Sequence, residues 1–121
     1  MKGIGIDLCG IERMERMMND RFLEKYYTQE ERDYLTARGQ MAPQSAAAMY
    51  AAKEAFLKAC GTGIGGGIAL NDVGVSHAPG GAPSYALGSA ALQKLHEMGA
   101  SCALLSLTHE AGVAAAVCVI E

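Results

Sequence analysis

An alanine-rich run that ends in a glycine segment is the feature of this 121-residue chain that most constrains its fold. Strong helix formers dominate residues 44–60, and Gly61 stands where a left-handed helix cap is expected. At 3.6 residues per turn, Lys53, Glu54 and Lys58 fall within about 140° of one another around this helix. Two interpretations are open: a charged face in water, or a metal or phosphate site with Glu54 as its carboxylate and Lys58 as its cation.

The first residues of the chain alternate with the two-residue period of a strand. Apolar side chains from Ile4 to Leu8 are expected on one face, and Gly3, Gly5 and Asp7 share the other. A face without side chains lets another backbone or a ligand approach closely. Asp7 is therefore either the cap of a turn or helix or a carboxylate in a site.

The remaining segments predict a single α+β domain over residues 1–121. Helical spacing of apolar residues predicts a helix over 11–27, and Thr28 with Glu31 has the form of a capping box that begins a helix over 29–37. Strands are expected over 73–77 and 83–87, a helix over 90–98, and strands over 101–108 and 112–120 around a turn that contains His109. The predicted order is β-α-α-α-β-β-α-β-β, a small antiparallel sheet packed with helices.

Composition argues against several classes of protein. The formal net charge of −3 argues against a nucleic-acid binder. No apolar run approaches the roughly 18 residues that cross a bilayer, and residues 1–3 lead into a strand without a signal-peptide pattern, so we expect a cytoplasmic protein without a membrane partner. The four cysteines are far apart and form no C-x-x-C pair, which is typical of buried, reduced thiols.

The glycine segment has the spacing G-x-G-x-x-G at Gly61, Gly63 and Gly66. It follows a predicted helix, whereas the dinucleotide-binding motif follows a strand, and the Gly-Lys-Ser/Thr of a P-loop is absent from the sequence. A helix-to-strand connection is the simpler interpretation. Its backbone amides can still contact a phosphate, because glycine allows close approach.

A carboxylate pair points to one class of chemistry. Asp7 on a strand and Glu54 on a helix suit Mg²⁺ when water and a phosphate substrate complete its coordination, whereas zinc prefers His or Cys. Lys58 is placed to stabilise charge at the phosphate or to help move a proton. The residues thus predict a Mg²⁺-dependent phosphoryl-type transferase with Asp7, Glu54 and Lys58 as its catalytic residues.

The predicted helix over 11–27 carries arginines beside Met and Phe side chains. Met adapts its shape and Arg forms paired hydrogen bonds, a combination that suits an acidic helical protein. Acidic residues are interleaved along the same segment, so core packing of the Met residues and solvated arginines explain the pattern as well.

Three motifs along the whole chain carry a resemblance to a known family. They are Gly-Ile-Gly-Ile-Asp-Leu at 3–8 followed by Ile-Glu-Arg at 11–13, Ala-Ala-Lys-Glu-Ala-Phe-Leu-Lys-Ala-Cys-Gly-Thr-Gly-Ile-Gly at 51–65, and Ser-Leu-Thr-His at 106–109. Together they resemble the holo-acyl-carrier-protein synthases, the short trimeric type within the 4′-phosphopantetheinyl transferase superfamily. The middle motif is the most specific of the three.

This resemblance implies a transferase that moves 4′-phosphopantetheine from coenzyme A to a serine hydroxyl of apo acyl carrier protein. It implies release of adenosine 3′,5′-bisphosphate and a role in fatty acid biosynthesis, within lipid metabolism. It also implies a homotrimer with active sites between subunits.

The resemblance further implies roles for individual residues. Asp7 and Glu54 would hold Mg²⁺, and Lys58 would lie beside the reacting phosphate. Coenzyme contacts are expected from Lys53, Gly61, Thr62, Gly63 and His109, and an acyl-carrier-protein surface from Arg13, Met17, Arg21 and Phe22.

Some positions depart from the family pattern. Met49 stands where members usually carry Arg, Gly66 where many have Lys, and Gly10 where many have Glu. Loss of two cations predicts weaker phosphate binding or a compensating charge from another chain. A binding protein that has lost catalysis and another Mg²⁺-dependent phosphotransferase are the competing interpretations.

Overall fold

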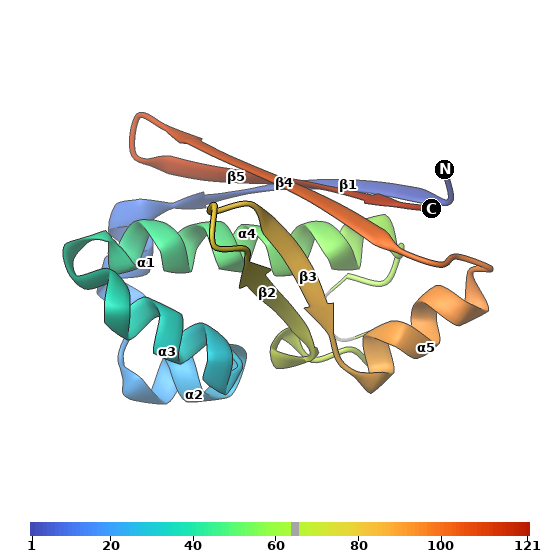
Figure 1. The fold of residues 1–121 in the computed structure, drawn as a ribbon, viewed down its shortest axis with the longest axis horizontal. Coiled ribbons are helices and arrows are strands. Elements are labelled where there is room, and N and C mark those ends of the chain that lie inside the picture. The colour runs from blue at the N-terminus through green and yellow to red at the C-terminus, as the bar shows by residue number, and fades with distance from the viewer. Residues whose placement is uncertain (64–65) are drawn as a thin grey trace.

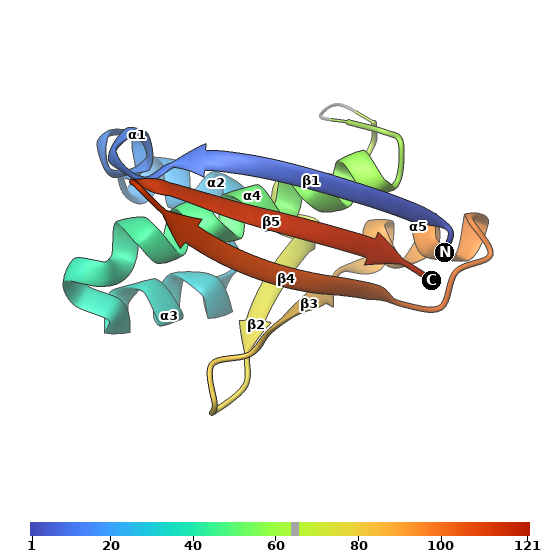
Figure 2. The same cartoon turned by 90° about the horizontal axis from the view of Figure 1, so that it is seen from above.

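A three-stranded antiparallel sheet joins the two ends of the chain (Figure 1). The computed structural model describes residues 1–63 and 66–121. In the sheet, β5 (Val113–Ile120) lies between β1 (Gly3–Gly10) and β4 (Ala103–Glu110). Figure 2 shows the N- and C-termini at the same end of this sheet, where the Lys2 N–H donates to the Ile120 carbonyl over 2.6 Å.

The long helix α4 (Ala42–Ala59) packs along one face of the sheet (Figure 1). Gly3 and Gly5 face this helix so closely that a Cβ on either would overlap a helix carbonyl oxygen, that of Ala59 or of Ala55 respectively. The predicted glycine face is therefore confirmed. The backbone that approaches it is that of α4.

The other face of β1 is left uncovered within the described chain. Ile4, Ile6 and Leu8 are 59%, 63% and 64% exposed. In register with Ile4, Val119 of β5 and the half-exposed Leu104 of β4 continue the same face across the sheet. An apolar sheet face in water is unusual, and faces of this kind mark contact surfaces.

Four helices precede the second strand, one more than predicted. The expected single helix over 11–27 is wrong, because the chain forms α1 (Ile11–Met17) and α2 (Asp20–Tyr26). Asn19 lies between them in an extended conformation and caps α2, its side chain accepting from the Phe22 N–H over 2.8 Å. The cap at Asn19 therefore ends one helix and begins another, although the helical spacing of apolar residues in the sequence continues past it.

The next helix confirms the predicted capping box. Helix α3 (Gln29–Arg38) begins with the Thr28 side chain accepting from the Glu31 N–H and the Glu31 carboxylate accepting from the Thr28 N–H. A short 3₁₀ turn, η1 (Gly39–Met41), then leads into α4. Figure 1 shows α1, α2 and α3 grouped around one end of α4.

The two strands predicted over 73–77 and 83–87 are confirmed, and they form a sheet of their own. After η2 (Leu70–Asp72), strands β2 (Val73–His77) and β3 (Pro83–Leu87) pair antiparallel as a hairpin that crosses α4 in the view of Figure 1, and α5 (Ser89–Glu97) follows. The Tyr85 hydroxyl donates to the Ala52 carbonyl over 2.6 Å and ties this hairpin to α4.

The last hairpin turns later than predicted. Strand β4 continues through Glu110, so His109 lies in the strand, and the turn is formed by Ala111 and Gly112, both with positive φ. All four cysteines are free; three are buried as expected, whereas Cys102 is exposed. No helix among the described residues is long and apolar enough to cross a bilayer.

The contact between β1 and α4 gives a sharp stability prediction. Gly5→Ala places a methyl group against the Ala55 carbonyl and 2.7 Å from the Ala59 nitrogen, and a backbone cannot yield as a flexible side chain can. We expect a loss of about 3 kcal/mol or more in the free energy of unfolding, measured by chemical denaturation. The control Gly80→Ala adds a methyl with no described atom within 4 Å and should cost about 0.5 kcal/mol or less. Equal losses in the two variants would contradict the packing argument.

Candidate active site

Asp7 and Lys58 meet where β1 crosses the last turns of α4. The Lys58 Nζ donates to Asp7 Oδ1 over 2.8 Å and to the Ile6 carbonyl over 3.1 Å. The Lys58 side chain is 54% exposed, whereas that of Asp7 is 11% exposed. The hydrogen bond to Asp7 raises the pKa of Lys58, so this side chain stays a cation at neutral pH.

Glu54 lies one helical turn before Lys58 and completes the cluster. Burial, then a hydrogen bond and the negative charge of Asp7, raise the pKa of Glu54 from its ordinary 4.5 to about 6, although Lys58 and Arg13 oppose the change. Two carboxyl groups this close repel each other when both are ionised. The structure thus brings Asp7, which the sequence placed on a strand, together with Glu54 and Lys58, which it placed on one helix.

The carboxylate pair fits a divalent cation. Asp7 Oδ2 is buried and has no hydrogen-bond partner among the described residues, so one oxygen of the pair is free to ligate. Across residues 1–63 and 66–121, no three His, Cys, Asp or Glu side chains gather as a metal site. Two carboxylates with open positions suit Mg²⁺, which keeps several waters and takes oxygens from a phosphate substrate.

The start of the glycine segment lies at the edge of this cluster. A pocket of about 250 Å³ is lined by Glu54, Leu57, Lys58 and Gly63. The backbone N–H groups of Gly61 and Thr62 are turned back to the helix, where they donate to the carbonyls of Lys58 and Leu57 over 3.0 and 3.1 Å. These amides are therefore engaged in capping α4. Ile64 and Gly65, which end the middle motif, lie outside the described residues.

Lys53 lies away from the cluster, contrary to the prediction that it contacts the coenzyme. It is fully buried, and its Nζ forms a 2.6 Å ion pair with Glu31. Burial lowers the pKa of Lys53, and Glu31 opposes this change. The sequence argument grouped Lys53 with Glu54 on a charged stripe, but the β2–β3 hairpin covers that side of α4 and takes Lys53 into the core.

His109 is also remote from the carboxylates of its own chain. Its Nε2 lies 3.1 Å from Gln44 Nε2, in the first turn of α4, whereas Glu54 lies ten residues further along. At 1.5 Å per residue this separates the two places by about 15 Å. His109 and Arg38 line a different pocket of about 260 Å³, together with Tyr34, Gln44 and Thr108.

Two of the four predicted docking residues, Arg13 and Phe22, are linked to the surroundings of the cluster. Arg13 on α1 and Arg21 on α2 are exposed, and Met17 and Phe22 are half-buried. The charge of Arg13 reaches Glu54, since it helps to lower the pKa of that group. Phe22 stacks on Tyr50 with ring centroids 6.1 Å apart and so joins α2 to α4 one turn before Glu54.

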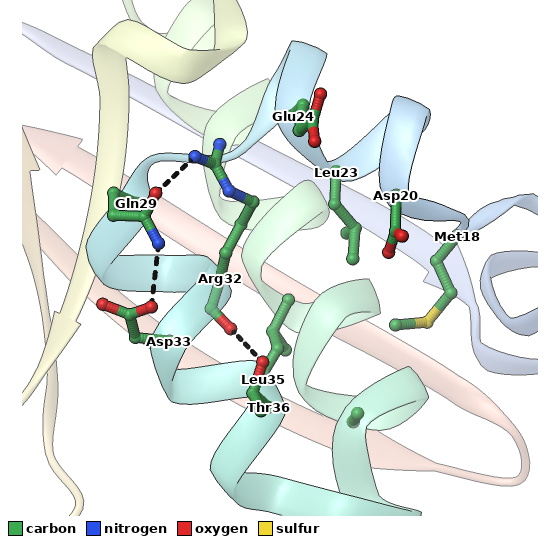
Figure 3. A pocket seen from close by; sticks show the side chains of 10 residues that line it. Met18, Asp20, Leu23, Glu24, Gln29, Arg32, Asp33, Leu35 and Thr36 are labelled. Atoms are coloured by element: carbon green, nitrogen blue, oxygen red, sulfur yellow. Dashed lines mark hydrogen bonds between the residues drawn. The ribbon is translucent and has the colours of Figure 1, made fainter.

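A third hollow, between α2 and α3, has about 350 Å³ of space (Figure 3). Three of its polar residues bind one another: Gln29 donates to Asp33 and accepts from Arg32, each over 2.8 Å. Its lining includes Met18, Leu23 and Leu35 rather than the predicted site residues. We therefore place the candidate site at the Asp7, Glu54 and Lys58 cluster.

The burial of Glu54 and its interaction with Asp7 predict a pH-dependent stability. Because folding raises the pKa of Glu54, the folded state holds this proton more tightly, and wild-type stability falls as pH rises from 4.5 through about 6. Without divalent metal, Glu54→Gln should raise Tm at pH 8 by about 2–5 °C, and this gain should shrink as pH falls toward 4.5. The control Glu24→Gln changes an exposed carboxylate on α2. A lower Tm for Glu54→Gln at pH 8, or a gain that pH does not change, would contradict the prediction.

Comparisons with known proteins found a family and relatives that match nearly the whole chain. A sequence model described as the 4′-phosphopantetheinyl transferase superfamily matches residues 3–118. The holo-acyl-carrier-protein synthase of Treponema denticola is 44% identical over 120 residues, which span 98% of this chain and 97% of the relative. That of Trichlorobacter lovleyi is 40% identical over 122 residues, spanning 98% and 96%.

Solved structures show the same fold. The holo-acyl-carrier-protein synthase from Neisseria meningitidis superposes with a TM-score of 0.90 at 33% identity, covering 100% of this chain and 98% of that one. The Helicobacter pylori enzyme in complex with coenzyme A gives 0.83 at 30% identity, covering 98% and 99%. The predicted α+β fold is confirmed. The chain belongs to the 4′-phosphopantetheinyl transferase superfamily and is an enzyme of the holo-acyl-carrier-protein synthase type.

Proposed function

We propose that this chain transfers 4′-phosphopantetheine from coenzyme A to a serine hydroxyl of apo acyl carrier protein, in support of fatty acid biosynthesis. The observation that carries the proposal is the meeting of Asp7, Glu54 and Lys58 at one end of α4. The match to the family over nearly the whole chain supports it, as does the coenzyme A complex of the Helicobacter pylori relative.

The reaction replaces a phosphoanhydride bond of the coenzyme A pyrophosphate by a phosphoester bond to serine. The serine hydroxyl loses its proton to the surroundings as its oxygen attacks the phosphorus that carries pantetheine, the bond from this phosphorus to the bridging pyrophosphate oxygen breaks, and adenosine 3′,5′-bisphosphate leaves. Mg²⁺ held by Asp7 and Glu54 would neutralise charge on the pyrophosphate. Lys58 is a cation rather than a base at neutral pH, and its exposed ammonium is placed to stabilise charge on the reacting phosphate.

The complete site is proposed to need more than one copy of the chain. His109 is separated from Glu54 by about 15 Å along α4, too far for both to contact one pyrophosphate within a chain. The exposed apolar face formed by Ile4, Ile6, Leu8 and Leu104 provides a surface for further copies. We assign this face to a homotrimer that brings His109 of one chain to the carboxylates of another.

Met49 and Gly66 stand where the family pattern has cations, and the pocket beside His109 supplies positive charge in their place. Met49 is fully buried, so it leaves no cation on the coenzyme side of α4, and a side chain at Gly66 would meet the Thr62 Cβ at 2.6 Å. Arg38 lines the pocket with His109, and its Nε donates to the Ser45 hydroxyl over 3.1 Å. We assign to Arg38 a contact with a coenzyme phosphate from the neighbouring chain.

Helices α1 and α2 form the proposed docking surface for acyl carrier protein. Arg13 and Arg21 are exposed for pairing with an acidic partner, and the half-buried Met17 and Phe22 offer apolar contact between them. Because the charge of Arg13 reaches Glu54, a partner bound here holds its serine near the carboxylates. The proposed docking surface thus adjoins the proposed active site.

A transfer assay tests the proposed function. The protein is mixed with apo acyl carrier protein, coenzyme A and Mg²⁺, and mass spectrometry detects the phosphopantetheine adduct. We expect Asp7→Asn and Glu54→Gln to lower kcat/KM by about 100-fold or more, because each removes charge at the metal and phosphate. Asp33→Asn, the same change at an exposed carboxylate on α3, should retain activity. Absence of the adduct with several carrier proteins would refute the proposed transfer and favour the competing interpretation, a binding protein that has lost catalysis.

The oligomer has its own test. Ile6→Asp puts a charge at the centre of the exposed apolar face, and we expect it to convert a trimer into monomers and to abolish transfer. The mass in solution is measured by light scattering after gel filtration. Leu92→Asp makes the same change at an exposed Leu on α5 and should leave the trimer intact. A wild-type protein that is monomeric at micromolar concentration would refute the assignment of this face.

A further inference from the structure

The ion pair between Lys53 and Glu31 joins elements on the side of α4 that faces away from Asp7. Both side chains are 0% exposed, and the Lys53 Nζ lies 2.6 Å from Glu31 Oε1. The same ammonium donates to the carbonyls of Leu70 and Val73 over 3.3 and 3.0 Å. All three of its protons are therefore used within the fold.

Glu31 uses both of its oxygens in the same way. Oε1 also accepts from the Thr28 N–H over 2.8 Å, and Oε2 accepts from the Val75 N–H over 3.0 Å. The pair thus connects the start of α3, the middle of α4, η2 and β2. It is a fully hydrogen-bonded buried pair, the form in which such a pair is tolerated.

A contribution to the stability of the fold does not by itself explain why this buried ion pair is present. Burying two charges costs hydration free energy, and well-packed apolar residues often replace buried ion pairs without loss. What apolar side chains cannot do is bind specific backbone carbonyls. The carbonyls in question, those of Leu70 and Val73, belong to the segment by which the chain returns to α4 after the glycine segment.

The described residues that precede and follow residues 64–65 are consequently both held by α4. On the preceding side, the Thr62 N–H donates to the Leu57 carbonyl over 3.1 Å. On the following side, Lys53 holds Leu70 and Val73, and the buried Ile68 and Leu70 line a pocket with Leu57. Leu57 also lines the pocket of Glu54 and Lys58, so the described residues on both sides are fixed close to the carboxylates.

We propose that Lys53, together with Glu31, is a positioning residue that fixes the returning chain at Leu70 and Val73 relative to Glu54 and so determines coenzyme affinity. The proposal rests on the proposed function. Glu54 and Lys53 are consecutive residues that point to different sides of α4, one to the carboxylate cluster and the other to the returning chain. The metal ligands are therefore expected to keep their geometry when Lys53 is replaced.

The test uses the variant Glu31→Gln/Lys53→Met, because Lys53→Met alone leaves a buried carboxylate without its cation. We expect the KM for coenzyme A to rise about 10-fold, as for groups that orient direct ligands, while kcat changes less than threefold and the Mg²⁺ concentration for half-maximal rate is unchanged. The control is Ile120→Ala, a buried strand residue outside this region, at a temperature where both variants remain folded.

A second measurement needs no activity. Hydrogen exchange of the backbone amides of Thr62, Val73 and Val75 should be faster in the double variant than in Ile120→Ala, relative to the amides of β5. If the wild type transfers no phosphopantetheine, the proposed function fails and exchange alone still decides whether Lys53 holds the returning chain. Should the double variant not fold, Glu31→Gln alone should show the same changes more weakly. Unchanged KM and unchanged exchange would overturn the proposal.

Discussion

The site depends on the close approach of β1 to α4. Gly3 and Gly5 remove the side chains that would otherwise keep the strand away from the helix carbonyls of Ala59 and Ala55. At this short separation Asp7, two residues further along the strand, reaches Lys58 and the neighbourhood of Glu54. A larger residue at either glycine would push the carboxylates of Asp7 and Glu54 apart. The positions of the site residues therefore depend on Gly3 and Gly5 having no side chains.

Electrostatic strain is concentrated at one end of α4. Two carboxyl groups share a half-buried space, and one of them keeps a buried oxygen without a hydrogen-bond partner among the described residues. Lys58 relieves part of this repulsion from the solvent side, and Arg13 acts on it from α1. This arrangement lowers the stability of the protein without a bound cation and favours cation binding. Such competition between function and stability is common at functional sites.

Much of this was predictable from local sequence patterns. Strand alternation placed Asp7 with the glycines, the capping box fixed the start of α3, and the strands predicted over 73–77 and 83–87 match β2 and β3. The predictions were wrong where a local cap determines the helix bounds or where tertiary structure determines which side chains are buried. Asn19 divides a helix that apolar spacing alone predicts to continue, and Lys53 looks solvent-exposed until a hairpin distant in sequence covers it. Charge patterning on one helix cannot reveal which of its sides other elements bury.

The strand order also constrains when the site can form. Strand β5 lies in the middle of the sheet, yet residues 113–120 are synthesised long after residues 3–10, with which they pair. Until β5 leaves the ribosome, β1 has no neighbour to hydrogen-bond and Asp7 has no fixed position against α4. Such distant pairing raises the contact order and slows folding. We therefore expect the carboxylate cluster to form late in folding, after the local hairpin β2–β3 and helix α3.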